Sequence, residues 1–143
     1  MAITVKEITL WRREIDNQPG VLAQMLDPFA DSDVDLKVLM AYRYTGNEAK
    51  GAVELYPVSG KKAGAAARSA GLSPTGIPAM LVEGANKPGI GYTTARAIAD
   101  AGINLAFLVA QVMGSRFSAV YGFDNESDRR RAISVLRKTS RKR

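Results

Sequence analysis

The sequence predicts an α+β protein made of two copies of one βαββαβ unit, packed together, each an antiparallel sheet with its helices on one face. Two observations support this prediction. The pattern Asn-x-Pro-Gly-aliphatic occurs at residues 17–21 and again 69 residues later at 86–90, and the apolar pattern that follows it repeats at the same spacing. A fixed spacing of this length indicates duplication of one supersecondary unit. The copies are assigned to residues 1–75 and 76–138, and residues 139–143 are assigned to a basic tail.

Each copy begins with an apolar segment that leads into the repeated motif. The segments ITLWRREI, residues 8–15, and PAMLVEG, residues 78–84, have the composition of strands. The Pro-Gly pair after each marks a helix start, where the missing N–H of proline costs nothing. Both helices have an apolar stripe, and Gly102 is placed to end the second one. Pro28 falls inside the first helix and predicts a local break there.

The second half of each copy is predicted to be a hairpin followed by a helix. The hairpin strands are DLKVLMAYRY with GAVELY in the first copy and NLAFLVAQVM with SAVYGF in the second. Helices are predicted over 61–70 and 127–138, with Ser127 as the N-cap of the latter, and a short strand within 72–76 completes the first copy. This is the ferredoxin-like arrangement. Because the second copy lacks a fourth strand, residues 3–5 or a partner chain are predicted to cover that edge.

The segments DNQPGVLAQMLDPFADSDVDL and ANKPGIGYTTARAIADAGINL resemble the ACT domain, a small-molecule sensing module, here in tandem. Each contains a strand end, Asn-x-Pro-Gly, an amphipathic helix and an Asn/Asp-Leu strand start, and the resemblance covers about residues 6–138. It implies a non-catalytic regulatory protein that binds an amino acid or related metabolite at a domain interface, near the loop between the first strand and first helix. It also implies side-by-side sheets, hence a homodimer, and a regulated enzyme or regulator as partner.

The ligand-binding residues follow from a local similarity to the regulatory domain of phosphoglycerate dehydrogenase, in which a loop Asn and an Asn at the start of the second strand hold serine. The matching positions are Asn86 and Asn104, and in the first copy Asn17 and Asp35; the His that precedes the family's loop motif is absent. Exposed amides at a helix start favour a carboxylate. The expected site is Asn86, Gly89, Ile90, Gly91 and Asn104, with Asn17, Gly20, Val21 and Asp35 as its counterpart, and the second copy is expected to be the more competent.

The alternative for each Asn is that its side chain only satisfies backbone groups of its own turn. For either Asn alone, the two interpretations have equal weight, whereas both together, across two copies, favour a binding site.

Composition excludes several other functions. The chain has no Cys and no His, so disulfides, thiolate metal sites, thiol nucleophiles and the usual general base are absent. We expect no catalytic residue, metal or cofactor. The longest nearly apolar run, residues 103–110, is far below the roughly 20 residues that a bilayer span requires. The N-terminal segment has no export leader, so a cytoplasmic location without a membrane partner is expected.

The net charge of +6 is concentrated at one end of the chain. Residues 1–128 contain 12 basic and 14 acidic residues, whereas residues 129–143 contain eight basic residues and no acidic one. The alternative function is therefore RNA binding, through the aromatic strand RFSAVYGF, residues 116–123, and this basic helix and tail. Because the strand lacks the glycine that RNA-recognition motifs carry after the basic residue, nucleic acid is the less favoured partner.

Overall fold

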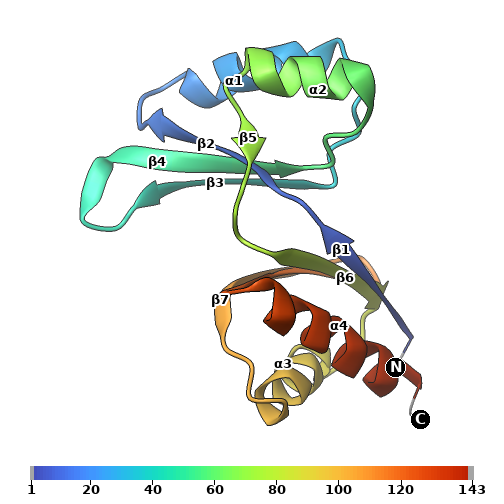
Figure 1. Ribbon diagram of the computed structural model, residues 1–143. Coiled ribbons are helices and arrows are strands. Elements are labelled where there is room, and N and C mark those ends of the chain that lie inside the picture. The colour runs from blue at the N-terminus through green and yellow to red at the C-terminus, as the bar shows by residue number, and fades with distance from the viewer. Residues whose placement is uncertain (1, 142–143) are drawn as a thin grey trace. The chain divides into compact units, whose positions relative to one another are not determined.

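The computed structural model describes residues 2–141 and divides them into two compact units (Figure 1). The first unit comprises residues 9–76, and the second unit comprises residues 2–8 together with 77–141. Each contains a four-stranded antiparallel sheet with two helices on one of its faces. The predicted α+β class and the duplicated unit are both confirmed.

The first unit follows the predicted order of elements. It contains β2 (Trp11–Asp16), α1 (Val21–Ala30), β3 (Val38–Tyr44), β4 (Asn47–Tyr56), α2 (Gly60–Ser69) and β5 (Ser73–Pro74). The strand order is β3-β4-β2-β5, so the short strand predicted within residues 72–76 forms one edge of the sheet. Its core lies between the sheet and the two helices and includes Met25, Phe29, Val53 and Leu55.

The second unit is built from β6 (Ala79–Ala85), α3 (Ile90–Asp100), β7 (Leu105–Met113), β8 (Arg116–Phe123) and α4 (Glu126–Arg141). Its fourth strand is β1 (Ile3–Ile8), and the strand order is β1-β6-β8-β7. β1 pairs with β6 from Ile3 opposite Gly84 to Ile8 opposite Ala79. The N-terminal segment therefore covers the edge as predicted, over a longer stretch than residues 3–5. Residues 2–8 were assigned from the sequence to the first repeat, but they belong to the unit that contains the second repeat.

A buried arginine explains how β1 is held. Arg129 on α4 is 8% exposed, and its Nη1 donates to the carbonyl oxygens of Ile8 and Ala79, each at 3.2 Å. Its guanidinium also pairs with the carboxylates of Glu7 at 2.8 Å and Glu126 at 2.5 Å. The Arg129 side chain thus joins the end of β1 and the start of β6 to α4. The charge has enough partners to offset its burial.

Two local predictions about the helices are wrong. α1 continues through Pro28 without a break. Pro28 lies in the last turn, so it removes one hydrogen bond, to the carbonyl of Gln24, and leaves only two residues to follow it. α4 is capped by Asn125, whose Oδ1 accepts a hydrogen bond from the Asp128 N–H at 2.8 Å, and Ser127 lies in its first turn. α4 also extends over 139–141, part of the expected tail, and residues 142–143 lie outside the described residues.

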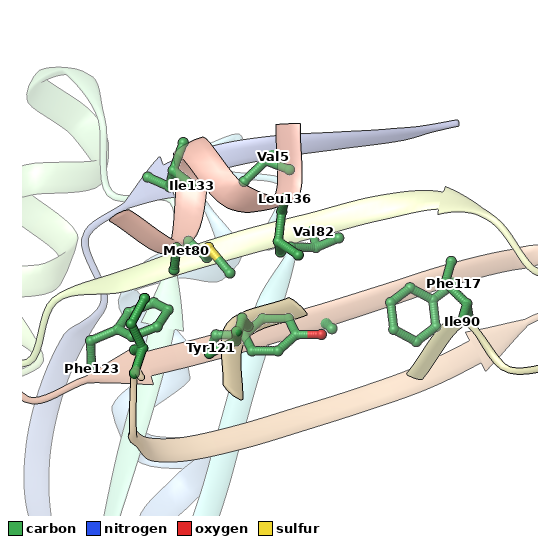
Figure 2. Close-up of a cluster of buried hydrophobic side chains, with 13 residues drawn as sticks. Val5, Met80, Val82, Ile90, Phe117, Tyr121, Phe123, Ile133 and Leu136 are labelled. Carbon is green, nitrogen blue, oxygen red and sulfur yellow. The ribbon is translucent and has the colours of Figure 1, made fainter. Parts of the chain in front are cut away.

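The core of the second unit is made of apolar side chains from β1, β6, β8, α3 and α4 (Figure 2), and it also contains a polar contact between Tyr121 and Thr94. The Tyr121 hydroxyl, which points along the core in Figure 2, donates to Thr94 Oγ1 at 2.8 Å, and Thr94 donates to the Ile90 carbonyl at 2.9 Å. Tyr121 and Thr94 are 1% and 0% exposed. Burial raises the pKa of Tyr121, and the hydrogen bond to Thr94 offsets part of that rise. The pair ties β8 to the first turn of α3.

Candidate functional site

The duplicated motif forms the same turn in both units. Gly20 and Gly89 precede α1 and α3 with φ values of 87° and 84°, which favour glycine. The Asn17 N–H donates to the Ala49 carbonyl at 2.9 Å, and the Asn86 N–H donates to the Ser115 carbonyl at 2.8 Å. The repeat seen in the sequence is therefore also a repeat in backbone conformation and hydrogen bonding.

The helix starts offer fewer free amides than expected. The N–H of Val21 bonds to the Gln18 carbonyl at 3.3 Å, and that of Ile90 bonds to the Lys87 carbonyl at 3.1 Å. The next two amides of each helix have no acceptor within residues 2–141; they belong to Leu22, Ala23, Gly91 and Tyr92. A carboxylate bound at either loop would therefore accept hydrogen bonds from these amides. Of the four residues, only Gly91 was among the predicted ligand-binding residues.

The structure does not bring together the loop and strand residues of one copy. Asn86 follows the end of β6 that pairs with Arg116, whereas Asn104 precedes β7, whose first residue pairs with Phe123. These are opposite ends of a sheet, separated by a seven-residue strand, or about 20 Å. The same register separates Asn17 from Asp35. One ligand can contact only one member of each pair, so both members would have to come from different copies or chains.

Asp35 has a further restriction. Its carboxylate pairs with Lys37 Nζ at 2.6 Å, with both side chains well exposed. The Asn17 side chain is also engaged, since its Nδ2 donates to the Glu48 carbonyl at 2.7 Å, which leaves its Oδ1 as the free polar atom. The Asn17 amide nitrogen thus satisfies a backbone carbonyl, although this carbonyl lies on β4 and not in the turn of Asn17 itself.

A hollow of about 270 Å³ lies beside the loop of the first unit. It is bounded by the end of β2, the loop, the first turn of α1 and the edge strand β3, and its lining comprises Ile15, Asp16, Asn17, Gln18, Leu22, Ala41, Tyr42, Arg43 and Gly51. Two of these residues carry opposite charges. Lys50 Nζ donates to Asp16 at 2.5 Å, and this hydrogen bond lowers the pKa of the Asp16 carboxyl. The Arg43 side chain is exposed and has no hydrogen bond or ion pair within residues 2–141.

Among these lining residues, only Asn17 was predicted from the sequence to bind a ligand. Arg43 and Asp16 lie outside the repeated motif, so no repeat-based signal marks them.

The equivalent position of the second unit is filled by an aromatic ring. In the first unit Gly51 pairs with Ile15 on one side and Arg43 on the other, and in the second unit Phe117 pairs with Gly84 and Val112. Phe117 is 5% exposed and belongs to the same core cluster as Ile90 (Figure 2). In the first unit the largest side chain of this row is Arg43 on the edge strand β3, whereas in the second unit it is Phe117 on the central strand β8. Val112 takes the place of Arg43 on the edge strand of the second unit. The geometry favours the first copy, not the second, as the more open site.

The RNA-binding alternative loses its stacking surface. The aromatic residues of β8 are Phe117, Tyr121 and Phe123, and they are 5%, 1% and 1% exposed within the core beneath α3 and α4. RNA-recognition motifs require such rings on the exposed face of the sheet. These rings cannot stack on bases, so only the basic part of that alternative has support.

Within residues 2–141 no group of three or more Asp or Glu side chains is arranged to hold a metal ion. No helix there combines the length and apolar character of a membrane span.

Comparison with known proteins identifies the fold. No protein-family model matches the sequence, and no curated protein matches it significantly. Solved structures do match. A protein from Bacteroides thetaiotaomicron superposes with a TM-score of 0.76 at 15% identity, over 94% of this chain and 90% of its own. The regulatory subunit of aspartate kinase from Thermus thermophilus, in its ligand-free form, gives 0.61 at 13% identity over 96% of both chains. A structure of aspartokinase alpha and beta subunits gives 0.59 at 18% identity, again over 96% of both.

The chain has a tandem ACT fold. The two ACT units account for the duplicated motif and for nearly the whole chain length. At these sequence identities the likeness establishes the fold alone.

Proposed function

We propose that this tandem ACT protein is a non-catalytic regulator that binds an amino acid or a similar zwitterionic metabolite at the β2–α1 loop of its first unit. The observation that supports this most directly is the hollow at that loop, where one unpaired cation and one carboxylate face the same space. The structural likeness to regulatory domains of aspartate kinase supports a regulatory role.

The charges suggest how the ligand would be oriented. A ligand carboxylate would pair with the Arg43 guanidinium and accept hydrogen bonds from the free amides at the start of α1. Its ammonium group would approach Asp16, which already holds one ammonium group, that of Lys50. Ile15 and Leu22 offer apolar contact to the ligand side chain. Modest affinity, micromolar to millimolar, is expected for a site this open to solvent.

The site would be completed by a second ACT unit. Within one unit the strand-start residues Asp35 and Asn104 lie at the far end of the sheet from the loop Asn, so such a residue must come from another copy. A ligand that bridges two units favours the arrangement in which both contacts are made. Only that difference in affinity between arrangements can transmit a signal to a regulated partner.

A homodimer is part of the proposal and is supported by the edge strand β7. This strand has nine residues, no charged side chain and no proline. Its exposed apolar residues include Leu108, Val109, Val112 and Met113, at 43–71% exposure. An unprotected apolar edge of this length is a template for pairing with another strand. A second copy of the chain is the proposed occupant. Placing a lysine at Val109 should shift the mass measured by light scattering from dimer to monomer; a native monomer would contradict this part.

The ligand proposal is tested by calorimetric titration of the native protein with the twenty amino acids, preceded by a thermal-shift screen. The Asn17→Ala variant should weaken binding of any ligand found by about twofold to 13-fold, since one neutral hydrogen bond contributes about 0.5–1.5 kcal/mol. Asn86→Ala is the matched control, because it alters the same motif in the copy whose equivalent position is filled by Phe117.

Two results would count against this placement. Equal weakening in both variants would move the site away from the first loop, and loss confined to Asn86→Ala would restore the second copy as the site. Melting temperatures must accompany each titration, because Asn17→Ala also removes the hydrogen bond to the Glu48 carbonyl.

A further inference from the structure

The positive charge of α4 is divided between cations that support the fold and cations that do not. Arg129 is consumed by the contacts that hold β1. Arg131 donates to the Ala101 carbonyl and pairs with Asp128 at 3.4 Å, on the side of the helix that faces α3. Arg137 donates to the Val5 carbonyl at 3.1 Å through one of its nitrogens. Arg130 and Lys138 have no partner within residues 2–141.

Arg130 and Lys138, which have no partner within residues 2–141, line one hollow of the second unit together with Arg137, one of whose nitrogens is bound to the Val5 carbonyl. This hollow has a volume of about 380 Å³, lies between α4 and the edge strand β1, and is lined by Glu7, Glu126, Arg130, Ile133, Ser134, Arg137 and Lys138. The positions 130, 134, 137 and 138 lie on one face of a helix, so three cations and one hydroxyl are directed to the same space. The two carboxylates, of Glu126 in the first turn of α4 and of Glu7 on β1, lie near the start of the helix and share the single positive charge of Arg129, so one net negative charge remains there.

We propose that this hollow binds a small phosphate ester with free hydroxyl groups, such as a nucleotide. Arginine, lysine and serine together form the donor set that proteins use for phosphate, and here they supply a guanidinium on each side of a hydroxyl. The carboxylates of Glu7 and Glu126, 62% and 53% exposed, are acceptors for ligand hydroxyls at the other end. The site is separate from the amino-acid site of the first unit and does not rest on it.

The distribution of charge favours a small ligand over a nucleic-acid strand. A strand that followed α4 through the hollow would have to run past both carboxylates at the helix start, where its phosphates would be repelled. A ligand with phosphates at one end and hydroxyls at the other avoids that repulsion. β8 provides no exposed rings on which bases could stack.

The test is a titration of the full-length protein with pyrophosphate, with ATP and with a twelve-nucleotide single-stranded RNA, followed by calorimetry at two salt concentrations. ATP should bind more tightly than pyrophosphate. The double variant Arg130→Gln/Lys138→Gln should weaken ATP binding by at least about tenfold, because it removes two charge-assisted contacts. Neither residue supports another group, so the melting temperature should be unchanged.

The matched control is Lys6→Gln/Arg116→Gln, which removes the same charge from the face of the second unit's sheet that the helices do not cover. It should retain ATP binding. Equal losses in both double variants would reduce the effect to net charge and overturn the proposal. So would the absence of ATP binding at millimolar concentration, or RNA binding that exceeds ATP binding and falls steeply with salt. The response to amino acids should persist in both double variants, so this proposal and the proposed function can fail independently.

Discussion

The sharpest test of the amino-acid site is the neutral substitution Arg43→Gln. Arg43 lines the hollow from the edge strand β3, and its exposed side chain has no hydrogen bond or ion pair within residues 2–141. Its removal should therefore change the free energy of unfolding by no more than about 0.5 kcal/mol, as for other surface positions. A guanidinium–carboxylate contact contributes about 1.5–3 kcal/mol, so the affinity for a carboxylate ligand should fall by about 10- to 150-fold.

The assay is calorimetric titration of native protein and variant with the tightest amino acid from the screen, alongside thermal unfolding. Arg68→Gln is the control, because Arg68 is an exposed arginine of the same unit outside the lining of the hollow. The corresponding amine without a carboxylate should bind native protein and variant alike. Unchanged affinity of Arg43→Gln for the amino acid would refute the assignment of the carboxylate to this side chain.

Three further predictions concern the framework around the sites. Thr94→Val should destabilise the protein by about 1–3 kcal/mol in urea unfolding, because it leaves the buried Tyr121 hydroxyl without its acceptor, and adding Tyr121→Phe should recover most of the loss. Arg129→Met should lower the free energy of unfolding by about 2–3 kcal/mol, which is less than for a fully buried ion pair because Glu7 and Glu126 are more than half exposed. Hydrogen exchange in this variant should show faster opening of β1 than of β7. Burial raises the pKa of Tyr121, and burial with a hydrogen bond to Glu54 raises that of Tyr42. Because the folded-state pKa lies above the unfolded value of about 10, stability should fall as the pH rises above about 10, by up to about 1.4 kcal/mol per pH unit for the buried Tyr121, and Tyr121→Phe should remove this part of the slope. Tyr42 is 45% exposed, so solvent screening makes its contribution smaller.

Elements with a strong local signal were predictable from the sequence. The Asn-x-Pro-Gly motif located both helix starts because proline and a glycine with positive φ are local requirements. The pairing of the N-terminal segment with the second sheet was also predictable, because the second copy has no fourth strand of its own and its edge needs another strand to cover it. The helix cap was not, because Asn125 and Ser127 have similar capping propensity and tertiary position decides between them. The hollow was missed for a related reason. It depends on which residues of three strands face one another, and that register is set by long-range pairing.

The duplication explains why the two loops can share a backbone and differ in chemistry. The turn is fixed by main-chain bonds and glycine conformation, so the rows of side chains beneath it are free to diverge. The second unit uses this freedom for stability: Phe117 fills the space next to Gly84, and the Tyr121–Thr94 pair anchors α3. The first unit has Leu55 and Met25 at the positions equivalent to that pair, and leaves a gap at Gly51. A Cβ at Gly51 would lie 2.4 Å from the Tyr42 carbonyl oxygen, so the gap cannot be closed from that position without moving the backbone of β3. The opening beside Arg43 is therefore built into the strand pairing itself, and a ligand can occupy it without displacing any core side chain.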